Sequence, residues 1–222
     1  MKLEGLHHIT MITGDARRNV QFYAETLGLR LVKKTVNFDA PDAYHLYFGD
    51  ETGAPGSILT WFEFPGAAPG RPGNGMIHLI ELGVRSPEAL EFWARRLAGA
   101  GYESRAAGDR LAFQDYEGLS FELVVADAAN PPLVAVHPEI PAEHALVGIQ
   151  GARAHGTDRP HAGDFLTDVL DFAGLGAGGY RLVGEQREFR WAYDDPPSQR
   201  SRQGGGTVHH IAWASSDEDH LT

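Results

Sequence analysis

The chain has no cysteine among its 222 residues. Disulfide bonds and thiolate metal sites are therefore excluded. Any metal ion would have to be held by histidine, aspartate or glutamate, and the sequence contains 11 histidines and 30 acidic residues. The positions of the histidines thus decide what metal chemistry the chain can support.

Basic residues and long apolar runs are also scarce. The 19 basic residues are outnumbered by the 30 acidic ones, which gives a formal net charge of −11. A chain this acidic is repelled by a phosphate backbone, so we expect no nucleic-acid partner. No apolar run approaches the roughly 20 residues of a membrane span, and the N-terminus lacks the apolar core of a signal peptide. We therefore expect no membrane partner and a cytoplasmic location.

Two similar histidine phrases lie near the two ends of the chain. Residues 6–10 are Leu-His-His-Ile-Thr, and residues 208–212 are Val-His-His-Ile-Ala. Each reads as the first strand of a repeated unit. Two such histidine pairs can converge on one metal ion if their units pack about a pseudo-twofold axis. Because side chains alternate along a strand, we expect only one histidine of each pair to enter a given cavity.

A unit of one strand, one helix and three strands repeats along the chain. We therefore predict an α+β fold in which tandem βαβββ modules pair into open barrel-like sheets. The predicted modules span residues 1–70, 71–130, 142–197 and 206–222. In the first module, the predicted elements are a strand at 6–12, a helix from about Asp15, and strands at 30–37, 44–49 and 57–64. In the second, they are a strand at 76–84, a helix from Ser86, and strands near 102–106, 110–114 and 119–125.

The fourth module contains little more than its first strand. Only thirteen residues follow His209, which is too few for a unit like the first. We expect the chain to be truncated in this module. The alternative is a natural end after one added strand.

The repeat and its histidines resemble the glyoxalase, bleomycin-resistance and extradiol dioxygenase superfamily, also called the vicinal oxygen chelate superfamily. Within it, several segments look like the four-module ring-cleaving dioxygenases that act on hydroquinones. These segments are residues 6–10, 28–37, 44–50, 55–56 and 208–213. The resemblance covers most of the chain, and it is weaker in the second and third modules than in the first.

The resemblance implies a metal ion, usually Fe(II), held by two histidines and one carboxylate, with Mn(II) or another divalent metal as the alternative. It assigns the second histidine of each pair, His8 and His210, as metal ligands. The carboxylate would be a glutamate from the last strand of the fourth module, which this sequence lacks. Two imidazoles and one carboxylate leave open coordination positions, as in non-haem Fe(II) oxygenases. We interpret His7 and His209 as catalytic groups beside the substrate, with simple packing as the alternative.

A comparison of the first two modules suggests an alternative metal site. Their helices align with an offset of 70 residues, which places His8 opposite His78. Their last strands, aligned on a shared glycine, place Thr60 opposite Glu122. The second module thus carries a histidine and a carboxylate at the two ligand-type positions.

The pairing of the modules decides between the two sites. If the first and fourth modules share a barrel, His8 meets His210. If the first and second share it, His8, His78 and Glu122 form a complete triad. The resemblance favours the first pairing, under which His78 and Glu122 keep structural, hydrogen-bonded roles. We interpret His45 as a hydrogen-bonded strand residue, with a place in the cavity as the alternative.

We predict an Fe(II)-dependent, extradiol-type ring-cleaving dioxygenase that acts on a hydroquinone or catechol-like aromatic. Its expected partners are that small aromatic substrate and O₂, and we allow for a homodimer. A glyoxalase-type isomerase or lyase would use a carboxylate base and no O₂. A non-catalytic binding protein, such as a resistance protein, would need neither His8 nor His210. For the 222 residues as given we expect weak or absent activity, because two histidines alone should hold Fe(II) poorly.

Overall fold

The structure is a computed structural model that describes residues 2–36, 43–127, 130–157 and 159–215. It confirms the α+β class and the repeated order of elements. The first module contains β1 (Leu3–Thr13), α1 (Ala16–Val20) with its continuation η1 (Gln21–Thr26), β2 (Arg30–Val36), β3 (Tyr44–Gly49) and β4 (Ile58–Glu63). The boundaries of the modules stay predictions.

The second and third modules repeat this order, and a single strand follows them. The second contains β5 (Ile77–Val84), α2 (Pro87–Gly99), β6 (Ser104–Ala107), β7 (Arg110–Gln114) and β8 (Ser120–Val125). The third contains β9 (Ile149–His155), α3 (Arg159–Asp168), β10 (Ala173–Gly176), β11 (Gly179–Val183) and β12 (Glu188–Asp194). The last described strand is β13 (Thr207–Ser215). No helix in the described part of the chain has the length and apolar character that a membrane span requires.

The first helix begins and ends where the sequence predicts. The carboxylate of Asp15 accepts a hydrogen bond of 3.0 Å from the backbone N–H of Arg18, which caps the helix. The wider π-helical turn of η1 brings Phe22 and Tyr23, which are neighbours in sequence, into the core together. Gly28 then reverses the chain at a φ of +71°, where a Cβ would lie 2.3 Å from Ile140. Only glycine fits this position without a shift of its neighbour.

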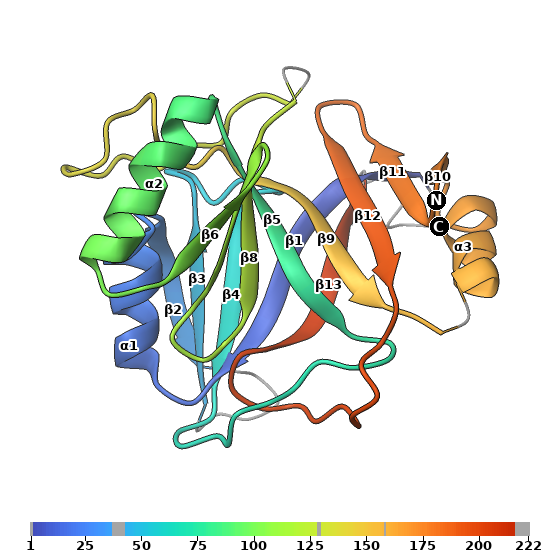
Figure 1. Cartoon of the computed structure of the whole chain (residues 1–222), viewed down its shortest axis with the longest axis horizontal. Helices are drawn as coiled ribbons and strands as arrows, with labels where there is room; N and C mark the ends of the chain where they lie inside the picture. The colour runs from blue at the N-terminus through green and yellow to red at the C-terminus, as the bar shows by residue number, and fades with distance from the viewer. Residues whose placement is uncertain (1, 37–42, 128–129, 158, 216–222) are drawn as a thin grey trace.

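The strands form two mixed sheets. The first has the order β13-β1-β4-β3-β2, and the second has the order β10-β11-β12-β9-β5-β8-β7-β6. The first and fourth modules therefore share one sheet, and the second and third share the other. The alternative pairing of the first module with the second is wrong. In Figure 1 the five-stranded sheet lies behind the eight-stranded sheet, with α1 and α2 together at one end.

One continuous apolar core joins the two sheets. At its centre the ring of Tyr23 lies 3.9 Å from that of Trp61, centroid to centroid, and both are fully buried. The Tyr23 hydroxyl donates a hydrogen bond of 2.7 Å to Oδ2 of Asp115, in the turn between β7 and β8. Burial raises the pKa of Asp115 to about 6. This hydrogen bond ties the helix of the first module to a turn of the second.

Replacement of Tyr23 by phenylalanine removes this tie. We expect Tyr23→Phe to lower the free energy of unfolding by about 1–3 kcal/mol, because one oxygen of a buried carboxyl loses its donor. The loss should be larger at pH 8, where Asp115 is ionised, than at pH 5. Urea denaturation at both values measures it. The matched control is Tyr44→Phe at an exposed position on β3, and equal losses in the two variants would contradict the account.

Candidate functional site

The structure brings His8 and His210 together across 202 positions of sequence. Strand β1 pairs antiparallel with β13, and this pairing places Thr10 opposite His210. The Nε2 atoms of His8 and His210 lie 3.4 Å apart. Metal–imidazole bonds of about 2.0–2.1 Å place two nitrogens that share one ion about 3.0–3.5 Å apart. The spacing of the two imidazoles therefore fits a single shared ion.

His7 and His209 lie beside these two rings instead of facing away from them. The Nδ1 atoms of His7 and His8 are 2.8 Å apart, and those of His209 and His210 are 2.9 Å apart. The prediction that only one histidine of each pair would face a given cavity does not fit these contacts. The β1–β13 ladder shifts its register between Leu6 and His8 and again where it passes His209. Such bulges break the alternation of side chains and aim neighbouring rings toward one another.

His7 and His209 orient the rings of His8 and His210 as metal ligands. Because Nδ1 of His8 and of His210 is occupied by its neighbour, Nε2 is the nitrogen left to meet an ion, as is usual for an oriented ligand. Burial first, and then the nearby His7, His210 and His45, together lower the pKa of His8 to about 4. Burial also lowers the pKa of His210. Both rings are therefore neutral near pH 7, which is the form that binds metals.

A row of hydroxyl and imidazole groups leads away from this pair. Thr10 Oγ1 lies 3.0 Å from Nε2 of His210 and 2.7 Å from Oγ1 of Thr60. His45 Nε2 is 2.9 Å from the Thr60 oxygen, and its Nδ1 is 2.8 Å from the hydroxyl of Tyr47. Both threonines are fully buried. Sequence reasoning missed Thr10 and Tyr47, although Thr10 stands two residues after His8 on the same strand.

No third ligand completes the site within the described residues. Among them, no group of three histidine, aspartate or glutamate side chains is arranged to hold a metal ion. The two imidazoles therefore stand without a carboxylate there. The origin of a third ligand stays a prediction.

The second sheet repeats the geometry of the first with different residues. Thr10 pairs with Thr60 between β1 and β4, and Glu81 pairs with Glu122 between the equivalent strands β5 and β8. Glu81 is therefore the counterpart of Thr10. Across the other edge, Glu81 pairs with Gly151 where Thr10 pairs with His210. The second sheet has no imidazole at the place of His210.

The same registers correct the predicted counterpart of His8. His8 pairs with Ile58, two positions before Thr60, and Leu79 pairs with Ser120, two positions before Glu122. Leu79 therefore occupies the place of His8, and the alignment that put His78 there was wrong by one residue. An alignment of helices does not fix the number of residues between helix and strand. The pairing between strands shows directly which residues occupy equivalent places.

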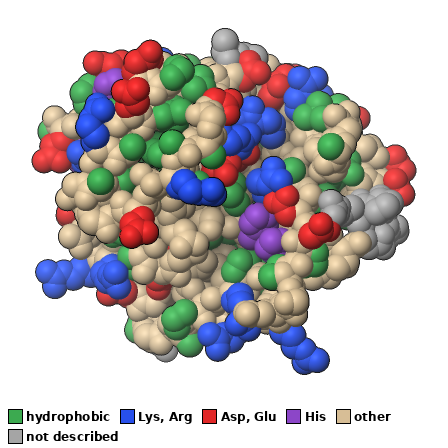
Figure 2. Space-filling view, viewed as in Figure 1, with side chains coloured by type: hydrophobic (Ala, Val, Ile, Leu, Met, Phe, Trp, Pro, Cys, Tyr) green, Lys and Arg blue, Asp and Glu red, His purple; other side chains and the backbone are tan. Residues whose placement is uncertain are grey.

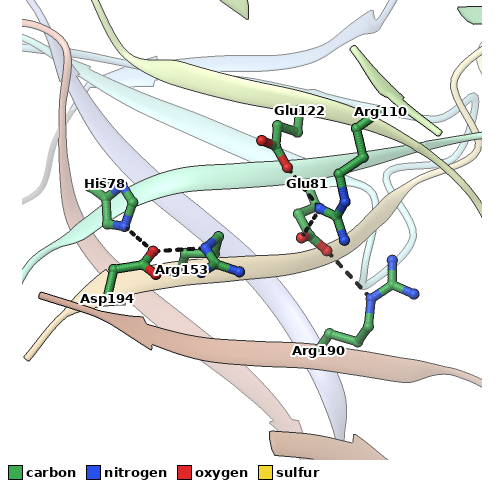
Figure 3. A network of polar contacts seen from close by, with 7 residues as sticks. All are labelled: His78, Glu81, Arg110, Glu122, Arg153, Arg190 and Asp194. Atoms are coloured by element: carbon green, nitrogen blue, oxygen red, sulfur yellow. Dashed lines mark hydrogen bonds and ion pairs between the residues drawn. The ribbon is translucent and has the colours of Figure 1, made fainter. Parts of the chain in front are cut away.

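Ion pairs fill the second sheet's counterpart of the histidine site (Figure 3). Arg110 Nη1 lies 2.6 Å from Oε1 of Glu81 and 2.7 Å from Oε2 of Glu122. Burial opposes the charge on Arg110, but its hydrogen bonds to the two glutamates outweigh burial and raise the pKa of the guanidinium. Arg190 Nε also approaches Glu81, at 3.4 Å. The guanidinium of Arg110 thus provides the cation that two adjacent carboxylates require.

His78 belongs to a second group on this face. Its Nε2 lies 2.8 Å from Oδ2 of Asp194, and Arg153 donates to both oxygens of the same carboxylate. The hydrogen bond with Arg153 lowers the pKa of Asp194 to about 2. His78 and Glu122 are thus hydrogen-bonded, as the favoured interpretation predicts. Basic and acidic side chains intermix around histidine on this face of the molecule (Figure 2).

Removal of the cation between the two glutamates should destabilise the fold. We expect Arg110→Met to lower the free energy of unfolding by about 3 kcal/mol, because it leaves the buried Glu81 with only its longer contact to Arg190 and leaves Glu122 without its cation. Adding Glu81→Gln should recover part of the loss. Arg105→Met, at an exposed position on β6, is the matched control. Urea denaturation that gives the same midpoint for both arginine variants would refute the role of Arg110.

The buried, neutral state of His8 predicts how stability depends on pH. The pKa of this histidine is 6.5 when the ring is exposed, as in the unfolded chain, and about 4 in the folded chain. Between these values the unfolded chain binds more protons, so the free energy of unfolding falls as the pH falls. Without metal, wild type should therefore lose stability from pH 6.5 to pH 4 more steeply than His8→Asn. Denaturation curves in EDTA across this range measure the difference, and parallel slopes would contradict burial of a neutral His8.

Comparison with known proteins places these features in a family. Residues 5–123 match the model of the Glyoxalase/Bleomycin resistance protein/Dioxygenase superfamily. "Putative ring-cleaving dioxygenase MhqA" of Bacillus subtilis (strain 168) is 36% identical over 239 residues, which cover 100% of this chain and 75% of that relative. A "Chlorohydroquinone/hydroquinone 1,2-dioxygenase" from Sphingobium indicum is 30% identical over 98% of this chain and 72% of its own length.

Solved structures agree with the sequence matches. The crystal structure of a "putative dioxygenase" from Bacillus subtilis subsp. subtilis str. 168 superposes with a TM-score of 0.87 at 36% identity. The match covers 99% of this chain and 73% of that one. Glyoxalase I from Zea mays superposes with a TM-score of 0.61 at 15% identity, over 93% of this chain and 72% of that one. The second match shows a shared fold only.

Proposed function

Because this chain belongs to the Glyoxalase/Bleomycin resistance protein/Dioxygenase superfamily, we propose that it is a ring-cleaving dioxygenase. We propose further that it is of the extradiol type, uses Fe(II), and opens a hydroquinone or catechol-like aromatic with O₂. The observation that carries the proposal is the 3.4 Å between Nε2 of His8 and Nε2 of His210. The names of the relatives support the reaction and the class of substrate.

The two imidazoles would hold the metal ion. Neutral nitrogen ligands together with one carboxylate suit Fe(II) in oxygenases, and we expect the carboxylate to come from outside the described residues. When bound, the ion supplies positive charge and open coordination positions where a hydroxylated aromatic and O₂ can meet. His7 and His209 hold the ligand rings in place through the Nδ1 contacts, and they are our candidates for catalytic groups beside the substrate.

A hollow next to the histidines supports a small aromatic ligand. It has a volume of about 470 Å³ and lies between β13 and the third module. His209 and His210 line it, together with Trp191 and Tyr193. Mostly apolar pockets with a few polar groups are typical of small-molecule sites.

Loss of either metal ligand should abolish metal binding and turnover together. We expect His8→Ala and His210→Ala to weaken Fe(II) binding at least about 100-fold, because even the loss of groups that orient a ligand costs about 10–100-fold. Anaerobic Fe(II) titration measures binding, and an oxygen electrode with hydroquinone and then catechol measures the reaction. His137→Ala, which removes a histidine far from the pair in sequence, is the control.

Three outcomes would count against the proposal. Unchanged Fe(II) affinity in both alanine variants would remove these histidines from the site. Metal binding with turnover of a glyoxalase-type substrate and no O₂ uptake would favour an isomerase or lyase. Retention of an aromatic ligand without metal and without either histidine would favour a binding protein.

A further inference from the structure

We propose that Tyr47, His45 and Thr60 form a proton relay that serves the candidate metal centre through Thr10. In this relay His45 is a positioning residue, because it reaches the centre only through the two threonines. The inference rests on the proposed function, since it assigns the route by which an aromatic hydroxyl group loses its proton there.

The relay is a continuous row of hydrogen bonds across three strands. It runs from the Tyr47 hydroxyl to His45 on β3, to Thr60 on β4 and to Thr10 on β1, with every step between 2.7 and 2.9 Å. Thr10 and Thr60 are fully shielded from solvent. A buried hydroxyl between two partners donates to one and accepts from the other. The whole row therefore has only two directions, and they reverse together.

The state of His210 selects the direction. While Nε2 of His210 carries a free lone pair, Thr10 can donate to it across 3.0 Å. With a metal ion bound at that nitrogen, His210 would offer no lone pair, and Thr10 would have Thr60 as its remaining acceptor. In that direction Thr60 donates to Nε2 of His45, and Nδ1 of His45 donates to Tyr47. The oxygen of Thr10 is left to accept a proton from a group bound at the centre.

The proton transfer balances without any further reactant. The O–H bond of the aromatic hydroxyl breaks, and its proton moves to Oγ1 of Thr10. The proton of Thr10 moves to Thr60, and that of Thr60 moves to Nε2 of His45. The products are a phenolate at the centre and an imidazolium at His45. No electron changes hands.

The surroundings of His45 suit a group that passes a proton on. Its ring packs between Tyr47, with centroids 4.1 Å apart, and Phe62, at 4.3 Å. Burial first, and then the nearby His210 on β13 and Lys33 on β2, together lower the pKa of His45 to about 4. An added proton is therefore held weakly and leaves through Nδ1 toward Tyr47, which is only partly buried. His7 and His209 contact other atoms and stand outside this row.

Two substitutions at Thr60 separate the relay from packing. Thr60→Val keeps the shape of the side chain and removes the hydroxyl, whereas Thr60→Ser keeps the hydroxyl. The probe is 4-nitrocatechol, whose absorption spectrum reports its ionisation, added without O₂ to protein loaded with Fe(II). After rapid mixing at equal pH, we expect the bound probe to ionise at least about tenfold more slowly in Thr60→Val than in wild type, because a positioned proton acceptor speeds proton transfer by at least this factor. Thr60→Ser should match the wild-type rate, and His45→Gln should repeat the slowing.

Metal titration of the same variants completes the test. Fe(II) affinity within about threefold of wild type, with ionisation slowed only when the relay is broken, supports the inference. Equal rates of ionisation in Thr60→Val and wild type overturn the relay and leave the proposed function intact. Loss of Fe(II) binding in Thr60→Val contradicts the relay, because Thr60 would then act on the ligands. Failure of wild type to bind Fe(II) or the probe, even at Fe(II) concentrations high enough to offset a missing carboxylate ligand, overturns the proposed function, and the relay with it.

Discussion

The structure depends on one antiparallel pairing, between the first strand and the last described strand. Closing a loop of some 200 residues costs only slightly more entropy than closing a loop half as long. The repeated modules make this closure specific, because each first strand offers the same edge to a partner. The β1–β13 ladder brings His8 and His210 to 3.4 Å, and two of its shifts of register bring His7 and His209 alongside. The pair of histidines is thus a product of strand pairing.

The two sheets show how one geometry supports two different interiors. In the five-stranded sheet, imidazoles and buried hydroxyls leave lone pairs that an ion and a proton can use. In the eight-stranded sheet, Glu81 and Glu122 occupy the places of the two threonines, and Arg110 supplies their positive charge. Two adjacent carboxylates, one buried and one partly buried, would be costly without a cation. In the eight-stranded sheet the two glutamates are therefore used in ion pairs with arginine.

The sequence predicts the order of the elements, because that order rests on repetition. The βαβββ repeat and the duplicated histidine phrase are visible without coordinates, but the repeat alone left two pairings of the modules open, and it was the family resemblance that selected His8 with His210. The bulges at the histidines could not be predicted, since one extra residue in a ladder leaves no mark on the local pattern. The same limit explains why His78, and not Leu79, was placed opposite His8. The row from Thr10 to Tyr47 needs the register of three strands, which no periodicity specifies.

On this account one metal ion joins β1 and β13, which are neighbours in the five-stranded sheet. Anomalous diffraction at the iron edge, from crystals grown with Fe(II) in the absence of O₂, tests it most directly. The account predicts one strong peak about 2.1 Å from Nε2 of both His8 and His210. A peak on only one of these rings, or one placed between Glu81 and Glu122, would contradict it.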